Sequence, residues 1–188
     1  YNWEPGNQRG PLGSHDGYAD AIESGINLLN RENDPDLRYW IDSEINVMFG
    51  MQQPGGIIEG WHGDGNFART ALMYGLWKTQ GARISPWSPS VRIGAVSSEK
   101  GTYFVLSAQI DWEGKLVFDS KRHKTILNLP LDYPRINQFP EWFTVDPQVR
   151  YSIRSSDSKL SDNYSGASLL NGIPLKLYAG ERLIIEIQ

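Results

Sequence analysis

The chain has 188 residues, of which 39% are hydrophobic and 21% charged, with a net charge of −4. This composition is typical of folded globular proteins and argues against disorder. The acidic balance disfavours nucleic acid and anionic membranes as partners, and no apolar run has the length of a membrane span. The absence of cysteine excludes a disulfide framework, a zinc–thiolate site and a thiol nucleophile.

Apolar residues recur at helical spacing before about residue 85 and predict three helices. The first runs over about 15–31 and the second from Asp34, its N-cap, to the segment 54–56, with a proline in its first turn. The third covers about 66–80, and Gly81 stands where a glycine cap is expected. The expected buried stripes are, in chain order, Tyr18, Ile22, Ile26 and Leu29; Leu37, Trp40, Ile41, Met48 and Met51; and Phe67, Ala71, Tyr74 and Trp77.

Short runs of β-branched and aromatic residues follow residue 85 and are typical of strands. Hairpins are expected over 91–109, around "SSEKG", and over 115–129, around "SKRH". Near the C-terminus we expect a short strand, a turn at Asn171 and Gly172, and two further strands. The fold class is therefore α+β, with a helical segment over 1–85 and an antiparallel β-sandwich over 86–188.

The segment 129–147 lies within the predicted sandwich but contains four prolines and four aromatic residues in nineteen. Such a composition excludes a regular helix or strand. Its aromatic side chains can anchor it on neighbouring elements. We expect an ordered loop or a binding loop.

Polar and aromatic side chains precede two of the predicted helices. The stretch "EGWHGDGNF" places several of them among glycines before the third helix, and His15 and Asp16 precede the first. Capping explains one of Asp64 and Asn66, but not the additional Glu59, Trp61 and His62. Glycines permit close approach of a ligand, and helix N-termini favour anionic groups. The two loops therefore predict a shared rim, and a metal site built from His15, Asp16, His62 and Asp64 is a weaker alternative because their spacing is irregular.

Glu44 lies within the apolar stripe of the second helix. A buried charge costs several kcal/mol unless it is paired or functional. Glu44 is therefore either a catalytic carboxylate or half of a buried ion pair with an arginine such as Arg69 or Arg38. Asp42 lies about 160° around the helix and is expected on another face.

Aromatic residues make up 12% of the chain, including seven Trp and nine Tyr. Several stand beside glycine, proline or acidic residues rather than within apolar periods. Because sugar rings stack on aromatic faces and their hydroxyls bind acidic and amide groups, this pattern favours a glycan ligand. At each single position, a core or interface anchor is the alternative.

Three stretches, "DGYADAIESGINLLNRE", "YWIDSEINVM" and "GWHGDGNFARTALMYGLWKTQG", are followed by a β-rich tail that includes "HKTILNLPLDYPRINQFPEWFTV" and ends "LLNGIPLKLYAGERLIIEI". Together they resemble the C-terminal part of bacterial six-hairpin glycosidase-like proteins. The resemblance implies an α/α toroid followed by a β-sandwich, and action on polysaccharides outside the cytoplasm, in the periplasm or after secretion. Three helices cannot close a toroid of twelve, so a preceding polypeptide or another chain would have to supply the rest.

The resemblance also implies that Asp16, His62 and Asp64, together with Glu44, face a sugar-binding cavity. We therefore expect glycoside hydrolysis by paired carboxylates, with no cofactor and no metal. The predicted catalytic residues are Asp64, Glu44, Asp16 and His62, and the predicted substrate-binding residues are Trp61, His15, Glu59, Asn66, Arg69 and Trp142. A polysaccharide lyase and a non-catalytic glycan-binding or structural module are the alternatives.

Overall fold

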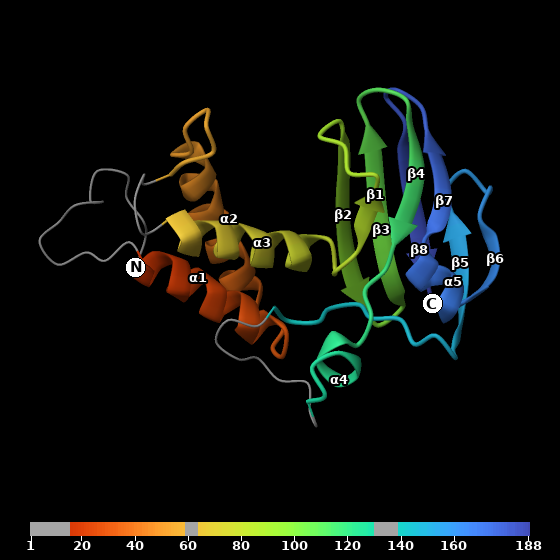
Figure 1. The fold of residues 1–188 in the computed structure, drawn as a ribbon, viewed down its shortest axis with the longest axis horizontal. Coiled ribbons are helices and arrows are strands. Elements are labelled where there is room, and N and C mark those ends of the chain that lie inside the picture. Colours follow the sequence, from red (N-terminus) through yellow and green to blue (C-terminus); the bar gives the residue numbers. More distant parts are fainter. Residues whose placement is uncertain (1–15, 59–63, 130–138) are drawn as a thin grey trace, which may run out of the picture. The chain divides into compact units, whose positions relative to one another are not determined.

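The computed structural model describes residues 16–58, 64–129 and 139–188 (Figure 1). Among these residues the chain forms two compact units. The helical unit contains the residues up to Gly75 together with 139–140, and the sandwich unit contains residues 76–129 and 141–188.

All three predicted helices are present: α1 Asp16–Leu29, α2 Pro35–Gly50 and α3 Asp64–Lys78. Asp34 is the N-cap of α2 as predicted, since its side chain accepts a hydrogen bond from the Leu37 backbone N–H at 3.0 Å. The helix ends earlier than expected, at Gly50, because the chain then enters a turn. In that turn the Gln53 backbone N–H donates to the Ile57 carbonyl at 2.8 Å.

Part of the predicted stripes lies in the core of the helical unit: Ile22, Ile26, Ile41, Met48 and Phe67 are buried, whereas Tyr18, Leu37, Trp40, Met51, Ala71 and Tyr74 are only half-buried. Gly25 allows α1 and α2 to pack closely, because a Cβ at this position would lie 3.2 Å from side-chain carbons of Leu37 and Ile41. The most deeply buried apolar residues of the three helices are Ala19, Ile22, Ile26, Ile41, Ile45, Met48, Phe67 and Met73. Hydrophobic burial at helical spacing therefore explains the helices, as their sequence pattern indicated.

The two ends of α3 differ in how well they were anticipated. The helix ends beside Gly81, as predicted, but the left-handed capping position belongs to Gln80, which has a φ of 50° and donates its N–H to the Trp77 carbonyl at 3.1 Å. Gly81, with a φ of 79°, follows it and donates its N–H to the Leu76 carbonyl at 2.8 Å. At the other end, Asn66 is the third residue of the helix and is not its N-cap. The helix starts two residues earlier than predicted because Asp64 and Gly65 already belong to its first turn.

The predicted antiparallel sandwich is present and confirms the α+β fold class. One sheet has the order β1-β4-β7 and the other the order β2-β3-β8-β5-β6, and all neighbouring strands are antiparallel (Figure 1). The strands are β1 Arg83–Ser85, β2 Val91–Ser98, β3 Gly101–Ala108, β4 Trp112–Val117, β5 Arg150–Ser155, β6 Ser161–Ser165, β7 Ile173–Leu177 and β8 Arg182–Ile187. The β2–β3 hairpin is the one predicted around "SSEKG".

Alternate side chains of both sheets form one apolar core. On β7, Ile173, Leu175 and Leu177 are buried, while Pro174 and Lys176 are exposed. Strands β3 and β8 show the same alternation. The core therefore lies between the sheets, and the opposite face of the three-stranded sheet is polar.

One predicted strand is replaced by the end of a short helix and a turn, and another is a helix. Residues 124–129 contain no strand, and Arg122–Thr125 form the short helix α4, where the Glu141 carboxylate accepts a hydrogen bond from the His123 N–H at 2.7 Å. The segment before Gly172 is the helix α5, Gly166–Asn171, which Ser165 caps by accepting from the Ser168 N–H. The hydrogen bond to Glu141 and the serine cap stabilise these two short helices. Consequently β4 pairs with β1 and β7 rather than in the predicted second hairpin.

The described part of the long segment, 139–147, contains no helix or extended strand, as predicted. It is anchored by Phe143, whose ring lies 5.8 Å from that of Phe104 and 6.1 Å from that of Phe118. The Val145 N–H also donates to the Asp119 carbonyl at 2.9 Å. Residues 130–138 lie outside the described part of the chain. No helix within the described ranges is long and apolar enough to cross a membrane.

Candidate functional site

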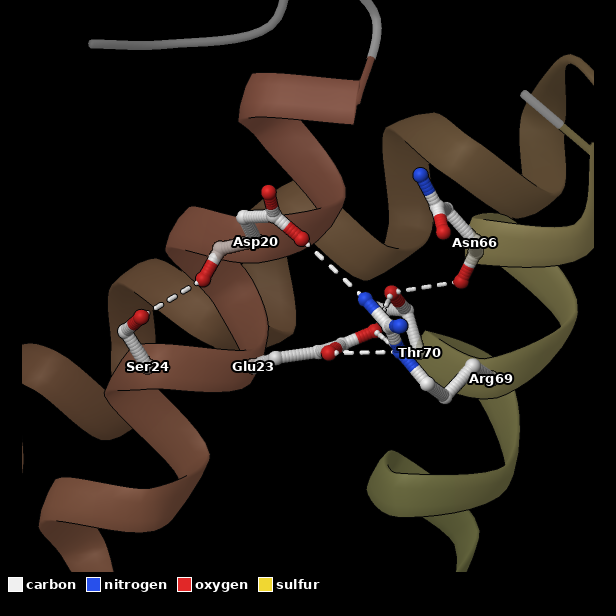
Figure 2. A network of polar contacts seen from close by, with 6 residues as sticks. All are labelled: Asp20, Glu23, Ser24, Asn66, Arg69 and Thr70. Carbon is white, nitrogen blue, oxygen red and sulfur yellow. Dashed lines mark hydrogen bonds and ion pairs between the residues drawn. The ribbon is translucent and has the colours of Figure 1, made fainter. Parts of the chain in front are cut away.

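Arg69 of α3 binds two carboxylates of α1 (Figure 2). Its Nε donates to both carboxylate oxygens of Glu23 at 2.8 Å, and its Nη2 lies 3.1 Å from Asp20 Oδ1. Thr70 completes the network by donating to Glu23 Oε1 at 2.8 Å. One arginine and one hydroxyl thus bind the acidic face of α1 to α3.

The two carboxylates differ in burial. The Glu23 side chain is 11% exposed and that of Asp20 is 62% exposed. The hydrogen bond that Arg69 donates to Glu23 raises the pKa of Arg69, and the charges of Glu23 and Asp20 act in the same direction against the effect of burial. Because both oxygens of Glu23 already accept hydrogen bonds from α3, Glu23 is suited to holding the helices together rather than to donating a proton to a ligand.

The two helices joined by this network, α1 and α3, are parallel (Figure 2). Asp20 pairs with Arg69, and Glu23, one turn further along α1, pairs with Arg69 and with Thr70. Figure 2 shows α1 and α3 side by side and running in the same direction. The N-terminal turns of both helices therefore lie at the same end of the helical unit. Two aligned helix dipoles favour negative charge there.

Aspartates begin both of these helices. Asp16 is the first residue of α1 and Asp64 the first residue of α3, so the structure brings their backbones to the same end. Their side chains lie outside the described part of the structure, as do the residues of the adjoining loops that were predicted to form the rim: His15, Glu59, Trp61 and His62. Asn66 lies in the first turn of α3, where its carbonyl accepts from Thr70 at 3.0 Å.

The two acidic residues singled out on α2 occupy different environments. Glu44 is only 3% exposed, in agreement with its place on the apolar stripe. Asp42 is half-buried and accepts a hydrogen bond from the Tyr74 hydroxyl of α3 at 2.8 Å. Burial raises the pKa of Tyr74, and the hydrogen bond and charge of Asp42 raise it further. The two carboxylates therefore differ in exposure.

Trp142 belongs to the sandwich unit and not to the helical unit. Its ring lies 6.5 Å from that of Trp77, and its indole Nε1 is buried without a hydrogen-bond partner in the described structure. The structure therefore supports an anchoring role for the Trp142 ring. Within the described ranges, no three histidine or acidic side chains form a group that could hold a metal ion.

The sequence interpretation missed Asp20, Glu23 and Thr70, although it named Arg69. A signal was present: Ala19, Glu23 and Ile26 follow one another at spacings of four and three, which places Glu23 beside the apolar stripe of α1. Glu23 is thus a second acidic residue at a buried helical position, besides Glu44.

Comparisons of the chain with protein-family models, with curated proteins and with solved structures found no match.

Proposed function

We propose that the chain is a glycan-active protein that hydrolyses glycosidic bonds at the end of the helical unit where α1 and α3 begin. The observation that supports this proposal is the parallel pairing of the two helices through Arg69, Asp20 and Glu23. This pairing carries the helix-initial residues Asp16 and Asp64 to one end. Most glycoside hydrolases use a pair of carboxyl groups, one on each side of the scissile bond.

In this proposal Asp16 and Asp64 are the carboxyl pair. One, as the acid, protonates the departing glycosidic oxygen; the other, as a carboxylate, attacks the anomeric carbon or activates water. His62 positions the substrate and Trp61 stacks on a sugar ring, as the resemblance to six-hairpin glycosidase-like proteins implies. Glu44 is assigned no contact with substrate because it is 3% exposed.

The test measures turnover of a panel of neutral and acidic polysaccharides. Turnover is detected as the release of new reducing ends. We expect Asp64→Asn and Asp16→Asn to retain the fold, since each change is nearly isosteric and removes only a charge that stabilises a helix N-terminus by about 0.5 kcal/mol, and to lose turnover by about 100-fold to 10,000-fold. Asp36→Asn is the matched control because Asp36 is an exposed aspartate in the first turn of α2. It should leave turnover unchanged.

Three outcomes would contradict the proposal. Full turnover in both variants would leave the aspartates with a purely structural role. Products with new ultraviolet absorbance would indicate elimination, and hence a polysaccharide lyase. Equilibrium binding of a glycan without any turnover would indicate a binding module.

A further inference from the structure

A groove of about 910 Å³ lies on the sandwich unit, at the three-stranded sheet. It is lined by residues from all three strands and from α5: Arg83, Ser85, Glu113, Lys115, Lys176 and Asn171 among others. The exposed side chains of the strands belong to the face opposite the apolar core, since alternate residues of β4 and β7 point to opposite faces. The groove is therefore a surface feature of a well-packed sheet.

The strand register orders the charges along this face. Ser85, Lys115 and Pro174 stand opposite one another across the three strands. Glu113 is opposite Lys176 in a neighbouring row, and Arg83 is opposite Val117 in the row on the other side. The rows of Arg83 and Lys176 are four residues apart along β4, or about 13 Å at the usual rise per residue. Three cations are therefore spaced along the groove.

None of the three cations forms an ion pair with another residue of the described structure. Arg83, Lys115 and Lys176 are all exposed. The Lys115 ammonium donates only to the Asn171 carbonyl, at 3.4 Å, and the Lys176 ammonium lies 5.5 Å from the Tyr178 ring centroid. With Glu113 as the one acidic lining residue, the groove carries two net positive charges on a chain whose net charge is −4.

We propose that this groove binds an acidic polysaccharide that carries one carboxylate on each sugar, such as a polyuronate. The cations pair with successive carboxylates, and Glu113, Ser85 and the groove's carbonyl groups bind sugar hydroxyls. Glu113 and the negative charge of the whole chain disfavour the denser charge of a nucleic acid. Trp87, which directly follows the lining residue Pro86 and is 76% exposed, adds an aromatic face for a sugar ring. The choice of a glycan rests on the proposed function, whereas the preference for an acidic ligand rests on the groove itself.

The test measures binding of hexagalacturonate and of its methyl ester to the full chain by titration calorimetry at low salt. We expect the methyl ester, which lacks the charges, to bind about tenfold more weakly, and added salt to weaken only the acid. The combined variant Arg83→Gln, Lys115→Gln, Lys176→Gln should lose about tenfold in affinity for the acid. The control variant Arg92→Gln, Lys100→Gln, Lys124→Gln removes three exposed charges of the same unit elsewhere and should bind within about twofold of the parent.

Equal affinity for the acid and its ester would overturn the proposal without the use of any variant. So would equal weakening by the control variant, or tighter binding of a single-stranded DNA of the same charge. The two proposals fail separately. The aspartate variants test hydrolysis through their turnover. The groove variant tests charge-dependent binding through its affinity. Each of these two results can occur without the other.

Discussion

Glu23 is the residue on which the joining of α1 to α3 depends most. Both of its oxygens accept from the Arg69 Nε–H and one also accepts from the Thr70 hydroxyl, and its side chain is 11% exposed. Asp20 binds the same arginine but remains 62% exposed. An exposed partner is screened by water, whereas a buried one leaves its counterpart unsatisfied when it is removed. The two carboxylates should therefore contribute very different amounts to stability.

We expect Glu23→Gln to lower the free energy of unfolding by about 2 kcal/mol, because Arg69 and Thr70 lose a charged acceptor in a buried place. Asp20→Asn is the matched control and should cost less than about 0.5 kcal/mol. Urea unfolding of both variants, followed by far-ultraviolet circular dichroism, provides the comparison. Equal losses of unfolding free energy in the two variants, or a more stable Glu23→Gln protein, would show that burial does not determine how much each carboxylate contributes to stability.

At the level of elements, α2 and α3 are joined by a tyrosine–aspartate contact. The Tyr74 hydroxyl donates to Asp42 Oδ1 at 2.8 Å, and the Phe49 ring meets the Tyr74 ring edge-on at 6.5 Å. Burial raises the pKa of Tyr74, and Asp42 raises it further. Because the folded-state pKa lies above that of the unfolded chain, the folded state retains this proton longer as pH rises. The hydrogen bond between α2 and α3 therefore stabilises the folded state less as the pH becomes alkaline.

This linkage predicts the sign of an alkaline effect. The stabilisation is fully present below the unfolded tyrosine pKa of about 10 and is lost as pH rises from there through the folded pKa. Tyr74→Phe should therefore lower stability by about 1 kcal/mol at neutral pH and flatten its decline above about pH 10. Unfolding midpoints in urea across this range test the effect, with the exposed Tyr39 changed to Phe as the control. A decline as steep in Tyr74→Phe as in the parent would contradict the assignment.

At the scale of the whole molecule, the large apolar core belongs to the sandwich unit. Its buried members run from Ala82 to Ile187 and come from both sheets. The helical unit relies on three helices of 14 to 16 residues, and helices of that length are only marginally stable without tertiary packing. The two units should accordingly differ in their ability to fold alone.

We expect a fragment of residues 76–188 to melt cooperatively with a strand-type circular dichroism spectrum, since it contains the whole core cluster. A fragment of residues 1–75 should show no cooperative transition, because it ends within α3 and lacks Trp77, a buried side chain of that helix. Thermal denaturation of the two fragments and of the full chain tests this expectation. A fragment 76–188 that melts without cooperativity would show that its core depends on the helices.

The features that could be predicted from the sequence are those set by neighbouring residues. The helices follow from apolar spacing, the start of α2 from the Asp34 cap, the end of α3 from Gly81, and the β2–β3 hairpin from its short turn. Each depends on contacts within a few residues, which a local pattern encodes. The buried position of Glu44 was visible for the same reason.

Contacts between distant residues decided the rest. Glu23 and Arg69 are 46 residues apart, so neither sequence pattern reveals that they pair or that their helices run in parallel. The helix at residues 122–125 is held by Glu141, which is 18 residues from His123 in the sequence. The helix at residues 166–171, in contrast, begins at a serine cap that spans only three residues, a local signal that the sequence interpretation missed. The groove exists only because β4 pairs with β1 and β7, which brings Arg83, Lys115 and Lys176 onto one face. The sequence of a strand does not reveal which strands it pairs with, since pairing is set by the packing of the whole sheet.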